Sequence, residues 1–109
     1  MGAAGWRRAG GQRRHGMEIG EFQRSIERIY FEKDSGRGLE GSFRWFVEEV
    51  GELARAMREG DRGMMAEEFS DVFAWLSTMA SICGVKLEDA VGKYAGGCPK
   101  CGQTPCGCE

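Results

Sequence analysis

Apolar residues recur at steps of three and four positions along most of the chain, which predicts α-helices. Residues 18–34 carry one such apolar face, made by Ile19, Phe22, Ile26, Ile29 and Tyr30. The glycines of residues 34–41 should end this first helix. Ser42 then stands where the cap of a second helix is expected, and that helix should continue to about Glu59.

The rest of the chain contains two more helical segments. Residues 60–63, Gly-Asp-Arg-Gly, predict a turn, residues 64–83 a third helix, and residues 86–94 a short fourth helix. No window alternates apolar and polar residues for long enough to demand a strand. Because short connections favour antiparallel neighbours, the expected fold is all-α, an antiparallel four-helix bundle.

The second and third helices each carry two acids and a tryptophan along one edge of the apolar face. These residues are Glu49, Glu52 and Trp45 on the second helix, and Glu68, Asp71 and Trp75 on the third. An antiparallel pairing about the turn sets Glu52 opposite Glu68, Glu49 opposite Asp71, and Trp45 opposite Trp75. One register therefore brings four carboxylates level with one another.

Four facing carboxylates raise one another's pKa unless a cation lies between them. Oxygen ligands select a hard divalent ion, which indicates Mg²⁺ or Mn²⁺. The alternative is that these acids are solvated and pair with the neighbouring Arg55, Arg58 and Arg62. Two acid pairs in matched register favour the metal site over this alternative.

Length and charge limit the classes of protein that fit. A chain of 109 residues suits one domain, and so small a core favours a homodimer or homotetramer. Residues 1–16 contain four arginines and no acid, whereas the rest of the chain has 11 basic and 17 acidic residues. This acidic body argues against a nucleic-acid-binding surface and suits cation binding.

The basic head, residues 1–16, has no apolar period and is predicted to be disordered. It is interpreted as a mis-assigned start or an added extension, and a basic arm that touches nucleic acid is the alternative. The sequence has neither the apolar run of a secretory signal nor one long enough for a membrane span, so we expect a cytoplasmic protein.

The two acidic motifs resemble those of a known family. Glu-x-x-Glu, a gap of fifteen residues and Glu-x-x-Asp, within the stretches WFVEEVGELARAM, EEFSDVFAWL and VKLEDAVGKY, are similar to the MazG-like nucleotide pyrophosphohydrolases of the all-α NTP pyrophosphatase superfamily. The likeness runs from about Met17 to the C-terminus, with the helical domain at 17–95.

The resemblance implies hydrolysis of a (deoxy)nucleoside triphosphate between the α and β phosphates, giving the monophosphate and pyrophosphate. It also implies that Glu49, Glu52, Glu68 and Asp71 are the magnesium ligands. Glu48 precedes the first motif and is expected to complete the metal shell or to orient the attacking water.

Candidate substrate contacts come from cations and aromatics around the predicted bundle. Lys33, Arg37 and Lys93 lie where the first and last helices should end near the bundle mouth, so they are candidates for binding phosphate. Trp45 and Trp75 are candidates for stacking on the base, although a tryptophan at a helix edge also suits the core of a small bundle.

The C-terminal segment, residues 96–109, carries a second candidate metal site. Cys98, Cys101, Cys106 and Cys108 have the spacing C-x2-C-x4-C-x-C, which predicts Zn²⁺ binding in a reducing compartment. The last two cysteines are closer in sequence than in common zinc ribbons, so a redox-labile tail is the alternative. Cys83 is predicted to be a buried apolar residue.

Two other functional classes are alternatives to the nucleotide pyrophosphohydrolase. A ferritin-like di-iron oxidase needs Glu-x-x-His motifs, and the one histidine, His15, lies in the basic head. A non-enzymatic helical oligomerisation or interaction module with a zinc-binding tail is the remaining alternative. A magnesium-dependent assay of pyrophosphate release separates it from the enzyme.

Overall fold

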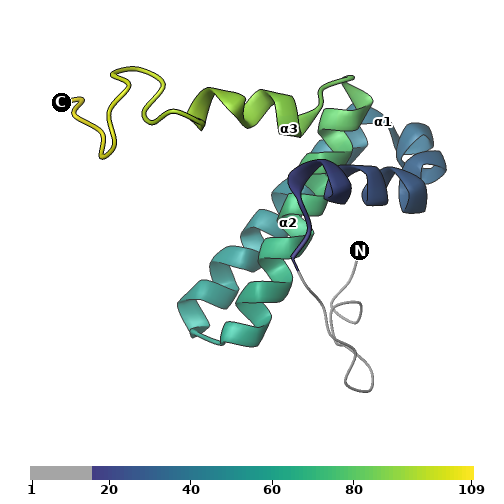
Figure 1. The fold of residues 1–109 in the computed structure, drawn as a ribbon. Coiled ribbons are helices and arrows are strands. Elements are labelled where there is room, and N and C mark those ends of the chain that lie inside the picture. The colour runs from purple at the N-terminus through teal and green to yellow at the C-terminus, as the bar shows by residue number, and fades with distance from the viewer. Residues whose placement is uncertain (1–15) are drawn as a thin grey trace.

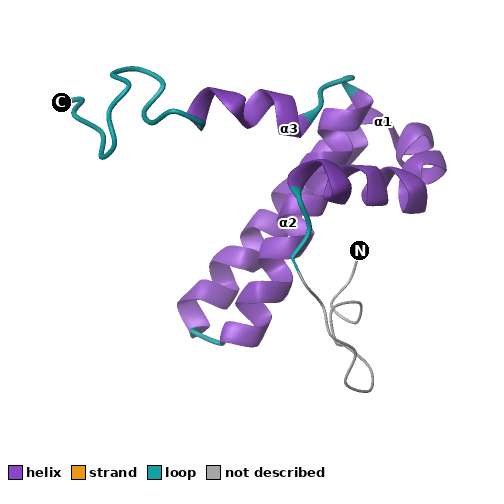
Figure 2. Ribbon diagram, viewed as in Figure 1, coloured by secondary structure: helices purple, strands orange, loops and turns teal. Residues whose placement is uncertain are grey.

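The computed structural model describes residues 16–109 and contains helices without strands in that range (Figure 1, Figure 2). The helices are α1 (Ile19–Glu59), α2 (Arg62–Ile82), α3 (Leu87–Ala90) and the short 3₁₀ helix η2 (Val91–Tyr94). The all-α prediction is therefore confirmed. The disorder predicted for the basic head concerns residues that lie, apart from Gly16, outside the described residues.

Helix α1 is bent at Gly38 into two arms. Gly38 has φ 82° and ψ 175°, a backbone conformation that a residue with a side chain rarely adopts. Figure 1 shows the purple first arm and the teal second arm running in different directions. The sequence correctly predicted an interruption of the helix within residues 34–41. The interruption is confined to the bend at Gly38, whereas a break between two separate helices was expected.

The prediction that Ser42 caps a second helix is wrong. Ser42 lies inside the second arm of α1 and is fully buried, with 0% of its surface exposed. The arm has already resumed helical geometry after Gly38, so the backbone amides beyond Ser42 are bonded within the helix and need no cap.

The turn between α1 and α2 matches the sequence prediction. The Gly60 amide donates to the Ala56 carbonyl at 2.9 Å and closes α1, and the Asp61 carboxylate accepts from the Met64 amide at 3.1 Å and caps α2. So short a connection returns α2 antiparallel along the second arm of α1 (Figure 1).

The first arm of α1 packs on the far half of α2. Phe22 and Phe73 stack with ring centroids 4.8 Å apart. The buried side chain of Gln23 donates to the Ser81 hydroxyl at 3.0 Å and the Val85 carbonyl at 2.9 Å, and accepts from the Leu87 amide at 2.8 Å. Gln23 thereby holds both the end of α2 and the start of α3.

The four-helix bundle is not confirmed within one chain. The predicted fourth helix forms as α3 and η2. Helix α3 contacts the first arm of α1 near its start, and η2 continues away from the α1–α2 hairpin (Figure 2). Among the described residues the buried apolar side chains are Ile26, Ala56, Ala74 and Trp75. Cys83, predicted to be buried, is exposed at the end of α2.

The described helices do not include a membrane span. Within residues 16–109, none is both long enough and apolar enough to cross a bilayer.

Candidate functional site

Three acids meet between the second arm of α1 and α2. Glu49, Glu68 and Asp71 each present a carboxylate oxygen, and these three oxygens lie within 4.8 Å of one another. Glu68 and Asp71 are each only 9% exposed to solvent. Oxygen Oε1 of Glu68 is buried and has no hydrogen-bond partner in the protein. We call these three residues the carboxylate trio.

The carboxylate trio is electrostatically strained without a cation. Burial, a hydrogen bond with Glu68 and the charges of Asp71, Glu68 and Glu52 raise the pKa of Glu49 to about 7. Burial, followed by the charges of Glu68 and Glu67, raises the pKa of Asp71 to about 6. The geometry therefore holds together acids that repel one another when they are all ionised.

The other acids of the predicted site lie around the trio. Glu52 is outside it, and its half-exposed carboxylate lies 3.9 Å from the Arg55 guanidinium. Its charge nevertheless contributes to the raised pKa of both Glu49 and Asp71. Glu48 is exposed on α1.

Glu67 was not identified from the sequence. Its Oε2 is buried without a partner, and its charge helps to raise the pKa of Asp71. The signal was present in the sequence, because Glu67 precedes Glu68 as Glu48 precedes Glu49, so the two helices carry the matching motifs Glu-Glu-x-x-Glu and Glu-Glu-x-x-Asp.

The carboxylate trio fits a hard divalent cation. Its donors are all carboxylate oxygens, the ligands that Mg²⁺ and Mn²⁺ prefer, and one of them is buried with its bonding capacity unused. A cation would also remove the repulsion that raises the two pKa values.

Beside the acids, two tryptophans and an arginine form a stacked platform. The rings of Trp45 and Trp75 are 6.1 Å apart and inclined by 10°. The Arg37 guanidinium lies over the Trp75 ring, 4.7 Å from its centroid. Trp75 is buried, whereas Trp45 is 48% exposed, so the open part of the platform is Trp45.

A buried carboxylate holds Arg37 in this position. Asp34, 5% exposed, accepts from Arg37 at 2.7 Å through Oδ1 and from the Thr78 hydroxyl at 2.8 Å through Oδ2. Asp34 and Thr78 were not identified from the sequence. Asp34 and Arg37 both lie on the first arm just before the bend at Gly38, and their contacts with α2 depend on the direction of that arm.

The two lysines are less closely tied to the acids. Lys33 is exposed on the first arm of α1. Lys93 is exposed on η2, where its ammonium lies 5.3 Å from the centre of the Tyr94 ring. Because η2 extends away from the α1–α2 hairpin, one chain does not bring Lys93 to the carboxylate trio (Figure 1).

The four C-terminal cysteines form a separate cluster. The sulfurs of Cys98, Cys101, Cys106 and Cys108 all lie within 4.8 Å of one another, and all four thiols are free. Backbone hydrogen bonds, first from Cys101 and then from Lys100, lower the pKa of Cys98 to about 6.

Comparison with known proteins assigns the chain to a family through more than half of its residues. Residues 37–101 match the family model described as the MazG nucleotide pyrophosphohydrolase domain. The matched residues include Arg37, both tryptophans and the whole carboxylate trio, whereas Cys106 and Cys108 lie beyond them. No match was found among curated proteins.

Proposed function

Because the chain belongs to the MazG nucleotide pyrophosphohydrolase domain family, we propose that it hydrolyses a (deoxy)nucleoside triphosphate to the monophosphate and pyrophosphate. The observation that carries this proposal is the carboxylate trio, with its buried and unpartnered oxygen, inside the family-matched residues.

Glu49, Glu68 and Asp71 would hold the divalent ion, with Glu52 as a fourth ligand. When bound, Mg²⁺ supplies neutralisation of phosphate charge and makes a water molecule more acidic. The protein's own part is to hold these carboxylates close together and shielded from solvent, while the bound ion would favour their ionised form. The exposed fraction of only 9% at Glu68 and Asp71 supports this role.

Hydrolysis also needs a group that accepts a proton from the attacking water. Glu48 and Glu67 directly precede Glu49 and Glu68, and both remain outside the trio. We assign to one of these two acids the role of orienting the attacking water and accepting its proton. Glu67 has the better support, because its Oε2 is buried with no partner, whereas Glu48 is exposed.

The stacked platform suits the remaining parts of a nucleotide. The exposed face of Trp45 can take a base by stacking, which tolerates any nucleobase because each has a π face. Arg37, held by Asp34, supplies a fixed positive charge for phosphate oxygens. Lys33 and Lys93 are weaker candidates, and Lys93 would have to come from a second copy.

A second copy of the chain would complete the helical bundle. Phe43, Val47, Val50 and Met57 are each at least 40% exposed and recur at steps of three, four and seven along the second arm of α1. This spacing makes one apolar stripe, which a homodimer or homotetramer would bury.

The test is a product analysis by phosphorus NMR, with a mixed pool of ribo- and deoxyribonucleoside triphosphates and Mg²⁺. We expect monophosphate and pyrophosphate to appear in equal amounts, and omission of the divalent ion to stop the reaction. Release of orthophosphate and a diphosphate would instead place the cleavage between the β and γ phosphates. Absence of any product from the pool would favour the interaction module with a zinc-binding tail.

A further inference from the structure

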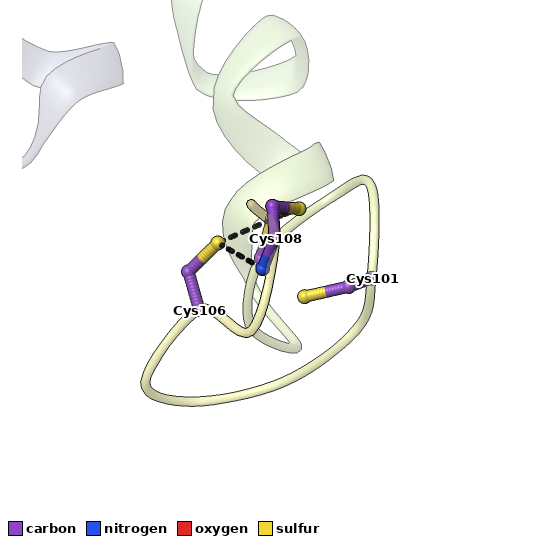
Figure 3. Close-up of side chains that lie close together, drawn as sticks. Cys101, Cys106 and Cys108 are labelled. Atoms are coloured by element: carbon purple, nitrogen blue, oxygen red, sulfur yellow. Dashed lines mark hydrogen bonds between the residues drawn. The ribbon is translucent and has the colours of Figure 1, made fainter.

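The four C-terminal sulfurs have the spacing of a tetrahedral metal site. The sulfur of Cys98 lies 3.6 Å from that of Cys106 and 3.7 Å from that of Cys108. Four sulfurs at about 2.3 Å from a central zinc ion are about 3.8 Å from one another. Figure 3 shows Cys101, Cys106 and Cys108 drawn together by the folded C-terminal loop.

The backbone around the cysteines is organised toward the sulfurs. The Gly107 amide donates to the Cys101 sulfur at 3.3 Å. The Cys108 amide donates to the Cys106 sulfur at 3.2 Å, the bond drawn in Figure 3. Such donors orient and stabilise thiolates that bind a metal. The four sulfurs themselves lie within 4.8 Å of one another.

Backbone hydrogen bonds close the loop at its first cysteine. The Cys98 amide donates to the Gln103 carbonyl at 3.0 Å, and the Gly102 amide donates to the Cys98 carbonyl at 2.7 Å. Gly97 has φ 119°, and a side chain there would come within 2.8 Å of the Thr104 hydroxyl. Only glycine fits at this closing point.

Burial does not account for the fold of this loop. From Glu88 to Glu109 every residue is exposed except Gly97 and Cys98, which are half-buried. A segment this small lacks a core, and such segments are usually held by a disulfide or a metal. All four cysteines are free thiols, so the disulfide is not formed here.

We propose that Cys98, Cys101, Cys106 and Cys108 bind one Zn²⁺ as a closed structural site, which folds the C-terminal loop independently of the carboxylate trio. Four thiolates fill a tetrahedral shell and leave no open position for substrate, so this site is structural and not catalytic. Sulfur donors select zinc, whereas the oxygen donors of the trio select magnesium, and the two ions therefore sort between the sites.

Binding is tested on the full chain, purified under reducing conditions and titrated with Zn²⁺ against a chromogenic zinc chelator. We expect one tightly bound zinc per chain. Cys101→Ser should lower the affinity at least about 100-fold, whereas Cys83→Ser, which changes an exposed cysteine outside the cluster, should bind like the wild type. Substitution with Co²⁺ should give the intense visible absorption of tetrahedral thiolate coordination.

A second readout reports on folding of the loop. Lys100 lies between the first two cysteines and is exposed, so trypsin can cut after it when the loop opens. Zinc should slow this cleavage at least about tenfold without changing cleavage near Arg58, because metal binding supplies folding free energy only locally.

Four outcomes would overturn the proposal: no zinc binding, binding that survives Cys101→Ser, an iron–sulfur chromophore, or stable disulfides in the reduced preparation. None of these outcomes depends on pyrophosphate release, so failure of the zinc site and failure of the proposed function are distinguishable.

Discussion

Glu49 and Asp71 are acids whose environment favours the protonated form. In both residues burial is the largest cause of the raised pKa, and neighbouring carboxylates raise the pKa further. The free energy that holds them together must come from the helices that carry them, because the acids themselves repel. A bound divalent ion reverses the sign of this contribution, since it favours the ionised form.

This leads to a prediction about pH. The pKa is raised from 4.5 to about 7 at Glu49 and from 3.8 to about 6 at Asp71, so the folded protein binds more protons than the unfolded chain between these values. The metal-free protein should therefore be most stable near about pH 4.5 and lose melting temperature up to about pH 8. Saturating Mg²⁺ should recover most of the loss, as measured by thermal unfolding with circular dichroism.

Asp71→Asn is the matched variant for this titration. It keeps the size of the side chain and removes one of the ionising groups, so its metal-free melting temperature at about pH 8 should exceed that of the wild type. A wild-type melting temperature that rises over the same pH range would contradict the account of the trio.

Thr78 is predicted to stabilise the protein through Asp34. Thr78→Val conserves shape but removes the donor to the buried Oδ2 of Asp34, which should cost about 1–3 kcal/mol in the free energy of unfolding. Urea denaturation at a fixed protein concentration measures this. Ser70→Ala, which removes a hydroxyl at an exposed site, should change stability by less than about 0.5 kcal/mol. Equal values for the two variants would contradict the role of Thr78.

At the residue scale, the sequence identified the site residues that follow from the helical period. It missed the residues whose contacts depend on the angle between two helical segments. Trp45 and Trp75 meet because an antiparallel pairing about a short turn fixes their register. The contact of Asp34 with Thr78 joins residues 44 positions apart. Its prediction would have needed the angle at which the first arm of α1 returns to α2.

Helix α1 is one element with two directions. Its second arm and α2 carry the trio, while its first arm supplies Asp34 and Arg37 to the tryptophan platform. The bend at Gly38 therefore joins the two halves of the candidate site.

A pair of glycine substitutions tests this bend. Gly38→Ala places a side chain at φ 82° and ψ 175°, where the backbone strain should cost about 1–3 kcal/mol. Gly36→Ala lies in helical backbone, and should stabilise by up to about 1 kcal/mol. Neither new Cβ meets an atom within 4 Å, so urea denaturation should report backbone effects alone. Shifts of the same sign would argue against the bend.

The elements themselves were predictable to different degrees. The turn at Gly60 and Asp61 could be predicted because Gly60 ends α1 and Asp61 caps α2. The end of the first helix was misjudged because Gly36 and Gly41 remain helical, and nothing local distinguishes them from Gly38. Tertiary packing of the first arm decides which glycine bends.

Many large apolar side chains of the described residues are exposed. On the second arm of α1 this surface forms the stripe of Phe43, Val47, Val50 and Met57, and on α2 it includes Phe69 and Leu76. The sequence predicted an oligomer from chain length, and the structure identifies the exposed apolar residues that such an oligomer would bury.

We predict that the protein sediments as a homodimer or homotetramer and not as a 12.0 kDa monomer. Val47→Glu combined with Val50→Glu should shift it toward the monomer, because two charges would enter the buried stripe. Met17→Glu, at an exposed apolar residue before α1, is the control and should not change the assembly. A wild-type monomer at micromolar concentration would contradict this prediction.

The most direct test of the central claim measures pyrophosphate release from a mixed triphosphate pool at saturating Mg²⁺. Asp71→Asn should slow the release at least about 100-fold while the helical circular dichroism is unchanged, because a ligand charge is lost from the trio. The double variant Cys106→Ser and Cys108→Ser should keep near wild-type activity, since neither cysteine lies at the carboxylates. Full activity in Asp71→Asn, with loss of activity in the folded cysteine variant, would move the active site to the C-terminal loop and contradict the account.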